Sequence, residues 1–170
     1  MKLALVVVTL GCGVVAAAES GVVAAVDAVR AGSASPQMIR IVYDEEDPPT
    51  RTIAIAVGND GTATITTSIV KRDCPRPSFA DCWDRTVRTT QLGSEAHRRL
   101  VAAVDARGLA KLPHEAAVAP GAARVSLTID AGTAGRLDVR CSRDTAERAP
   151  TFARLRDDLL ALGAGANRSP

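Results

Sequence analysis

Residues 94–112 carry the most regular helical pattern in this sequence of 170 residues. Apolar side chains recur there every three or four positions and charged ones fill the remainder, which predicts a helix with one apolar face. We expect Ser94 to cap its first turn and Gly108 to end it in a left-handed conformation. Because a short amphipathic helix is unstable alone in water, the rest of the chain must supply a surface that covers its apolar face.

The first half of the chain predicts strands for that surface. Alternating apolar and polar residues indicate strands at 38–43, 52–57 and 62–70, and β-branched residues indicate an edge strand at 86–90. The turn residues 59–61, Asn-Asp-Gly, predict a hairpin between the second and third strands. We expect Ile65 and Ile69 to point inward from the third strand. These segments together predict an antiparallel meander.

Residues 44–49 interrupt the first strand, since they combine four acidic residues with two prolines and proline cannot join a central ladder. The acidic residues Asp44, Glu45, Glu46 and Asp47 are of the type that binds Ca²⁺, but they lack the spacing and the glycine of a calcium-binding loop. We therefore expect a solvated hairpin end rather than a metal site.

The second half predicts another hairpin and a closing helix. Alternation at 125–129 and 137–141 fits one register, in which Ile129 pairs with Leu137 and Asp130 faces Arg136 on the solvent side. The same register pairs Leu127 with Val139 and Val125 with Cys141. Phe152, Leu155, Leu159 and Leu162 then trace a helix that starts near Pro150 and ends before Gly163. The element order predicts an α+β domain with two helices on one face of a mainly antiparallel sheet.

The N-terminus is organised like a secretory signal peptide. Lys2 precedes an apolar segment at 3–15 and three alanines at 16–18, after which we expect cleavage. This apolar segment is shorter than the roughly 20 residues that a membrane span needs. A retained membrane anchor and a lipoprotein modified at Cys12 are the less favoured alternatives, the second because the preceding residues match a lipobox poorly.

The predicted cleavage leaves a secreted or periplasmic protein. We expect a flexible, loosely ordered mature N-terminus at 19–36 with at most a short helix around 22–29, a single domain at 37–162 and a disordered tail at 163–170. Positive charge is carried almost wholly by arginine, and together with abundant alanine and glycine this indicates a GC-rich bacterial genome.

Charge and motifs exclude several classes of function. Removing the leader removes one positive charge, Lys2, so the net charge falls from +2 to +1. This balance argues against binding to nucleic acid or, after cleavage, to an anionic membrane. His97 and His114 lack the spacing of zinc ligands, and no nucleophile elbow or phosphate-binding loop is present. We therefore predict no metal, no cofactor and no enzymatic activity, with a small secreted hydrolase that uses His114 as the least favoured alternative.

The cysteines of the mature chain predict a stapled loop. Cys74 and Cys82 flank a short segment with two prolines, and an oxidising compartment favours a disulfide between them. The third, Cys141, lies on the apolar side of its strand. We expect it to be a buried small side chain rather than a reactive thiol.

Two of the four aromatic residues, Phe79 and Trp83, lie in or beside this loop, and Arg76 and Arg85 are near them in sequence. Tryptophan and arginine dominate the binding energy of many protein interfaces, so the loop is a candidate surface for a protein partner. The other interpretation, which is the commoner arrangement, is that both aromatic rings fold back under the loop as a small satellite core.

Residues 92–162 resemble the emfourin-type protein inhibitors of thermolysin-like metalloproteases. In both, a helix leads into a short Leu-Pro exit, here Gly108 to Pro113, and a hairpin and a leucine-rich helix follow. The resemblance implies an α+β fold and inhibition of an extracellular protease. The family also carries a Gly-Gly-Phe-like motif near its first strand, and residues 39–47 have no counterpart, so no inhibitory residue is assigned from it.

The sequence thus favours a secreted, non-catalytic domain that binds a macromolecule through residues 74–83. An extracellular protease inhibitor is the first alternative. The sequence leaves the oligomeric state open.

Overall fold

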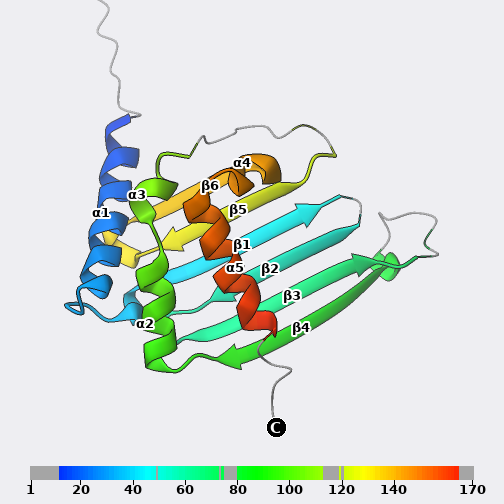
Figure 1. The fold of residues 1–170 in the computed structure, drawn as a ribbon, viewed down its shortest axis with the longest axis horizontal. Coiled ribbons are helices and arrows are strands. Elements are labelled where there is room, and N and C mark those ends of the chain that lie inside the picture. The colour runs from blue at the N-terminus through cyan, green and yellow to red at the C-terminus, as the bar shows by residue number, and fades with distance from the viewer. Residues whose placement is uncertain are drawn as a thin grey trace, which may run out of the picture.

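A computed structural model describes residues 12–48, 50–72, 74, 80–112, 119 and 121–164. Six strands form one antiparallel sheet in the order β4-β3-β2-β1-β5-β6 (Figure 1). The strands are β1 (Arg40–Asp47), β2 (Arg51–Val57), β3 (Thr62–Val70), β4 (Trp83–Gln91), β5 (Arg124–Asp130) and β6 (Arg136–Ser142). The helices are α1 (Cys12–Arg30), α2 (Ser94–Ala103), α3 (Ala106–Leu109), α4 (Arg143–Glu147) and α5 (Pro150–Ala164). Single 3₁₀ turns are η1 (Pro36–Met38), η2 (Ala80–Cys82) and η3 (Gly132–Ala134).

The helices lie on one face of the sheet and leave the other face open (Figure 1). Alternate residues of the five strands β1, β2, β3, β5 and β6 are buried beneath them, as in β1, where Ile41, Tyr43 and Glu45 face the helices. The predicted α+β class with a mainly antiparallel sheet is confirmed, and α1 joins the two helices that we expected. No helix in the described part of the chain is both long enough and apolar enough to span a membrane.

The hairpin of β5 and β6 has the predicted register. Ile129 lies opposite Leu137, and the pairs Leu127–Val139 and Val125–Cys141 follow from it. Asp130 lies opposite Arg136, but the Arg136 guanidinium binds Asp138 on its own strand, with Nε 2.8 Å from Oδ2. Asp130 instead accepts a hydrogen bond from the backbone N–H of Gly132, so its carboxylate stabilises the turn.

Strand β1 continues through the acidic segment, contrary to the interruption that we predicted. Strand β2 pairs with β1 as far as Asp47 and β5 pairs with it as far as Glu46, so Glu45 lies opposite both Ile53 of β2 and Val125 of β5. Proline follows only after Asp47, at the point where β1 ends. The acidic residues are therefore part of a central strand, not a solvated hairpin end.

Strands β1, β2 and β3 otherwise form the antiparallel meander that we predicted. The edge strand β4 begins at Trp83 and is longer than the strand expected at 86–90. Ile65 and Ile69 of β3 lie on the same, helix-covered face of the sheet as expected, but only Ile65 is buried, whereas Ile69 is 51% exposed. Among the described residues, no helix covers that end of β3 (Figure 1).

The predicted helix at 94–112 is two helices with a break at Val104 and Asp105. The side chain of Arg30 donates to the carbonyl oxygens of Ala102 and Val104 at 3.0 and 2.8 Å, and so satisfies groups that the end of α2 leaves unpaired. Asp105 then begins α3 by accepting a hydrogen bond from the N–H of Gly108 at 2.9 Å.

Both caps that we expected for that helix are wrong. Ser94 is the first helical residue of α2, and the N-cap is Gly93, which makes no side-chain capping bond. Gly108 lies inside α3 and does not have a positive φ. The closing helix α5 begins at Pro150 as predicted but continues through Gly163 to Ala164.

The short helix expected around 22–29 is part of the longer helix α1, which orders residues 19–30 of the segment that we expected to be loosely ordered at 19–36. Its residues Val22, Ala25, Val26 and Val29 repeat at helical spacing and are buried in the core. Gly21 packs so closely on η3 that a methyl group there would overlap the carbonyl oxygen of Ala134.

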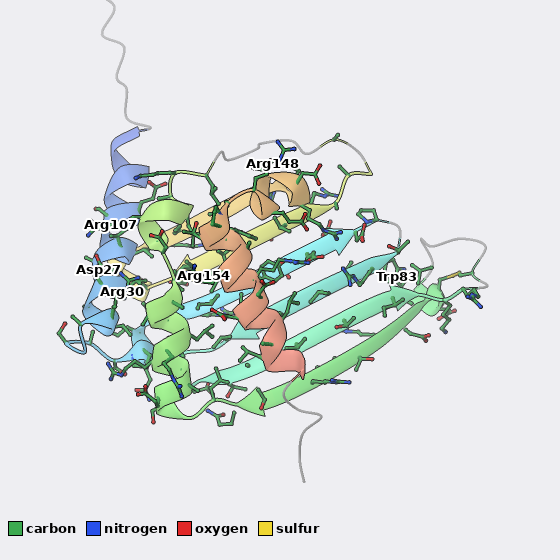
Figure 2. All side chains as sticks on the ribbon, viewed as in Figure 1. Asp27, Arg30, Trp83, Arg107, Arg148 and Arg154 are labelled. Carbon is green, nitrogen blue, oxygen red and sulfur yellow. A yellow bond between two sulfur atoms is a disulfide. The ribbon has the colours of Figure 1, made fainter. Side chains whose placement is uncertain are left out.

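Charged side chains fix α1 to α3. Asp27 of α1 accepts a hydrogen bond from Arg107 of α3 and another from Arg30 of its own helix, each at 2.8 Å (Figure 2). The apolar face of α1 and these pairs together make the helix part of the fold.

Candidate functional site

A disulfide joins Cys74 to Cys82 and closes the connection between β3 and β4, as predicted. Cys82 is buried, and its carbonyl oxygen accepts a hydrogen bond from the N–H of Lys71 at 2.8 Å. The Lys71 ammonium donates to the carbonyl oxygen of Asp81 at 2.8 Å. The loop is therefore tied at its base by a covalent bond and by two hydrogen bonds. Arg76 and Phe79 lie outside the described residues.

Trp83 follows the disulfide directly and begins β4, opposite Val70 of β3 (Figure 2). Alternation along the strand places Trp83, Arg85 and Val87 on the open face of the sheet. Trp83 is half-buried, Arg85 is exposed and Val87 is 54% exposed. We call the disulfide with these three residues the stapled end. Two of the four predicted partner-binding residues, Trp83 and Arg85, thus lie on one face of β4.

Removing both cysteines, with Cys74→Ser and Cys82→Ser, should lower the free energy of unfolding by about 2.5 kcal/mol, the chain-entropy value for a ring of about nine residues. Urea denaturation followed by circular dichroism measures the change. A reducing agent should lower the midpoint of the wild type and leave that of the variant unchanged. Equal midpoints for the oxidised wild type and the variant would contradict the prediction.

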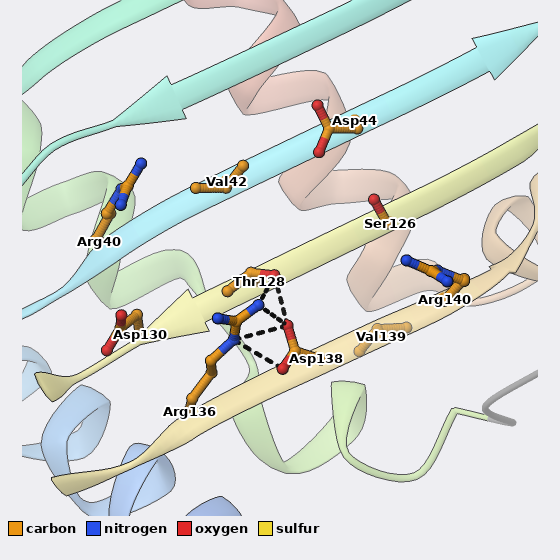
Figure 3. A pocket seen from close by; sticks show the side chains of 10 residues that line it. All are labelled: Arg40, Val42, Asp44, Ser126, Thr128, Asp130, Arg136, Asp138, Val139 and Arg140. Carbon is orange, nitrogen blue, oxygen red and sulfur yellow. Dashed lines mark hydrogen bonds and ion pairs between the residues drawn. The ribbon is translucent and has the colours of Figure 1, made fainter. Parts of the chain in front are cut away.

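A shallow hollow of about 620 Å³ lies on the open face of β1, β5 and β6 (Figure 3). Its charged lining consists of three arginines and three aspartates: Arg40, Arg136, Arg140, Asp44, Asp130 and Asp138. Arg136 donates to both carboxylate oxygens of Asp138, and the hydroxyl of Thr128 donates to Asp138 at 2.6 Å. The hydrogen bonds and charge of Asp138 raise the pKa of Arg136. The three positive and three negative side chains cancel in charge and partly bind each other. The lining of the hollow therefore carries no net charge.

A buried carboxylate, Glu45, lies on the helix-covered face and is 1% exposed. Its Oε2 accepts from the Tyr43 hydroxyl at 2.7 Å and from Arg156 Nε of α5 at 2.9 Å. Its Oε1 is 3.1 Å from Arg51 Nη2 of β2 and 2.9 Å from Arg143 Nη2 of α4. One carboxylate therefore connects β1, β2, α4 and α5.

The charges of this cluster shift the pKa values of its members. Burial alone would raise the pKa of Glu45, but hydrogen bonds from Arg156 and Tyr43 and the charges of Arg156 and Arg143 outweigh it and lower that pKa. Burial, together with the hydrogen bond and the charge of Glu45, raises the pKa of Tyr43. Glu45 is thus held ionised and Tyr43 neutral at physiological pH. Both Glu45 oxygens are already bound by protein donors, so the cluster is a structural network.

Sequence reasoning missed this network. A signal was available, since Glu45 continues the alternation of Ile39, Ile41 and Tyr43 on the inward side of one strand. An acidic residue at an inward position of a strand requires cationic partners. Those partners come from residues 51, 143 and 156, and their positions depend on the tertiary fold.

The remaining candidates are placed as follows. Cys141 is buried and is not part of a disulfide. His97 is buried, and this burial lowers its pKa, although the charge of Asp60 opposes the shift. His114 lies outside the described residues. Within the described ranges, no group of three or more histidine, cysteine or acidic side chains could hold a metal ion.

Fold and site together define a two-layer α+β domain with a disulfide at one end of its sheet. No protein-family model matches the sequence. The search of curated proteins found no match either.

Proposed function

We propose that this protein is an exported, non-catalytic binding protein that contacts a protein partner through the stapled end. The observation that carries the proposal is the position of Trp83, half-buried beside the Cys74–Cys82 disulfide and on the same face as the exposed Val87. Tryptophan anchors with neighbouring arginines are typical of the residues that dominate binding energy. A covalent cross-link reduces the number of conformations open to the residues it encloses, so the Cys74–Cys82 disulfide lowers the entropy cost of binding.

Export is supported by the disulfide. Disulfides persist in oxidising compartments such as the periplasm and the extracellular space. The side chains of α1 are described from Glu19 onward, and those that are buried (Val22, Ala25, Val26 and Val29) all lie after the predicted cleavage site at Ala18. Removal of the leader therefore leaves the described core intact.

Inhibition of an extracellular protease is the second candidate. Residues 92–162 resemble emfourin-type inhibitors in sequence, and the Cys74–Cys82 disulfide lies at the end of the sheet where Trp83 begins β4 (Figure 2). The simplest check titrates the purified protein against thermolysin and against trypsin and follows residual activity. Stoichiometric loss of one activity would support this candidate, and full activity of both proteases at excess protein would contradict it.

The binding proposal is tested with Trp83→Ala and with Met38→Ala as the matched control. Met38 is also an exposed large apolar residue, but it lies in η1, away from the disulfide. Each protein is immobilised and exposed to the extracellular and periplasmic proteins of a GC-rich bacterium. We expect one partner retained by the wild type and the Met38 variant, and at least about tenfold weaker binding to the Trp83 variant.

Two outcomes would overturn the proposal. One is retention of the same partner by the Trp83 variant at unchanged affinity. The other is unfolding of that variant by circular dichroism, which would show that Trp83 is a satellite core residue.

A further inference from the structure

Strand β4 is exposed on both faces and forms one edge of the sheet. Every side chain from Asp84 to Thr89 is exposed, whereas the other five strands alternate between buried and accessible residues over most of their length. Its register with β3 runs without a bulge from Thr62–Gln91 to Val70–Trp83, and the strand contains no proline. A long, regular edge strand of this kind presents unpaired backbone groups to another strand.

We propose that β4 pairs with β4 of a second copy of this chain, antiparallel across a twofold axis at Thr86. The dimer would contain one continuous sheet with twelve strands. This inference goes beyond the proposed function, because it concerns self-association and does not need the partner.

The charges of β4 select this register. A twofold axis normal to the sheet places one residue opposite its own copy, and the residues on either side pair symmetrically. With Thr86 on the axis, Asp84 of each copy lies opposite Arg88 of the other. Axes at Asp84, Arg85 or Arg88 would place like charges opposite each other, which is destabilising.

These side chains are on the correct face for such pairs. Asp84, Thr86 and Arg88 lie opposite Ile69, Thr67 and Ile65 of β3, so all three lie on the helix-covered side of the sheet. The Asp84 carboxylate is exposed and lies 3.7 Å from the Lys71 ammonium, a loose surface pair. The Arg88 guanidinium has five N–H donors, so it can bind an additional carboxylate without losing its existing contacts.

The same register covers apolar surface on the open face. Val87 would lie opposite Arg85 of the second copy, with that copy's Trp83 and Val87 as its diagonal neighbours. Diagonal neighbours in a sheet are within reach of an aromatic side chain. The exposed Val87 therefore acquires the apolar contacts that a single copy does not provide.

Charge reversal on the purified full chain tests the proposal, with sedimentation velocity as the measurement. The wild type should be a dimer. Arg88→Asp places two carboxylates opposite each other at both ends of the pairing, and should weaken the dimer at least about tenfold. Adding Asp84→Arg to it reverses both charges and should restore the wild-type dissociation constant within about threefold.

Two further variants test the register. Arg85→Asp changes the charge of the same strand by the same amount but lies opposite Val87, so it should leave the dimer nearly unchanged. Thr86→Cys should form an intermolecular disulfide on mild oxidation, whereas Thr89→Cys should not, because Thr89 would lie opposite Trp83. Non-reducing electrophoresis shows which of the two cysteine variants forms a covalent dimer. The wild type, run beside them, shows any cross-linking through Cys12 or Cys141.

A monomeric wild type at the highest soluble concentration would overturn the proposal. A double charge-reversal variant that associates no better than Arg88→Asp would also overturn it. Neither result depends on a binding partner, so the proposed function is tested separately.

Discussion

A chain that begins at Gln37 should fail to fold, whereas a chain that begins at Glu19 should fold as the full sequence does. The first lacks α1 and the loop after it, and the second lacks only the predicted leader. The difference follows from the core, because α1 buries Val22, Ala25, Val26 and Val29 against the rest of the domain.

The expected cost of losing α1 is large. Burying a valine side chain contributes about 1.5 kcal/mol or more, so three valines and one alanine contribute on the order of 5 kcal/mol. Arg30, which pairs with the carbonyl oxygens of Ala102 and Val104, is lost as well. Net stabilities of domains are only about 5–15 kcal/mol, so this loss is comparable to the whole stability.

Circular dichroism and urea denaturation of both truncated chains measure the effect. The chain from Glu19 should show a cooperative transition with the midpoint of the full chain, and the chain from Gln37 should show no cooperative transition. A variant of the Glu19 chain with Ala24→Ser, at an exposed position of α1, is the matched control and should retain the midpoint. A stable, cooperative chain from Gln37 would show that α1 is dispensable.

Glu45→Gln should lower the free energy of unfolding by about 3–5 kcal/mol at pH 7, because it removes one charge from a buried ionic network and leaves its partners uncompensated. The side chain keeps nearly the same size, so the loss is electrostatic. Arg51, Arg143 and Arg156 then surround a neutral amide that cannot balance their charge.

The neighbouring Glu46→Gln is the matched control. Glu46 lies on the same strand but on the open face, where it is exposed and pairs with Arg124 at 3.3 Å. Exposed ion pairs contribute about 0–1 kcal/mol, so this variant should lose no more than that. Urea denaturation of both variants gives the comparison, and similar losses in the two would contradict a special contribution from Glu45.

The dependence on pH has a defined sign. The pKa of Glu45 is lower in the folded protein than in the unfolded chain, where it is about 4.3. The stability that Glu45 supplies is therefore fully present above the unfolded pKa and is lost as the pH falls through the lower, folded pKa. The wild type and Glu45→Gln should differ most above about pH 5 and converge in more acidic solution. A difference that is constant from pH 7 to pH 3 would contradict this assignment.

Local sequence patterns were sufficient to predict the β5–β6 hairpin and the Cys74–Cys82 disulfide. The alternation at 125–129 and 137–141 fixes which side chains share a face, and the short turn between them leaves one register, so Ile129 had to face Leu137. Likewise, Cys74 and Cys82 are close in sequence, and their pairing needs no distant contact. The α+β class follows from the same kind of information, because element order and periodicity are local.

The tertiary structure decided the features that depend on distant residues. The break in the helix at 94–112 is stabilised by Arg30, which is more than 70 residues away in sequence and donates to the carbonyl oxygens of Ala102 and Val104. Glu45 is buried because arginines of β2, α4 and α5 meet around it. Segment 19–30 is ordered because the sheet and α2 cover its apolar face. In each case the stabilising partner is remote in sequence. The spacing of apolar residues predicts which face of a segment is buried, but it does not predict which distant residues pack against that face.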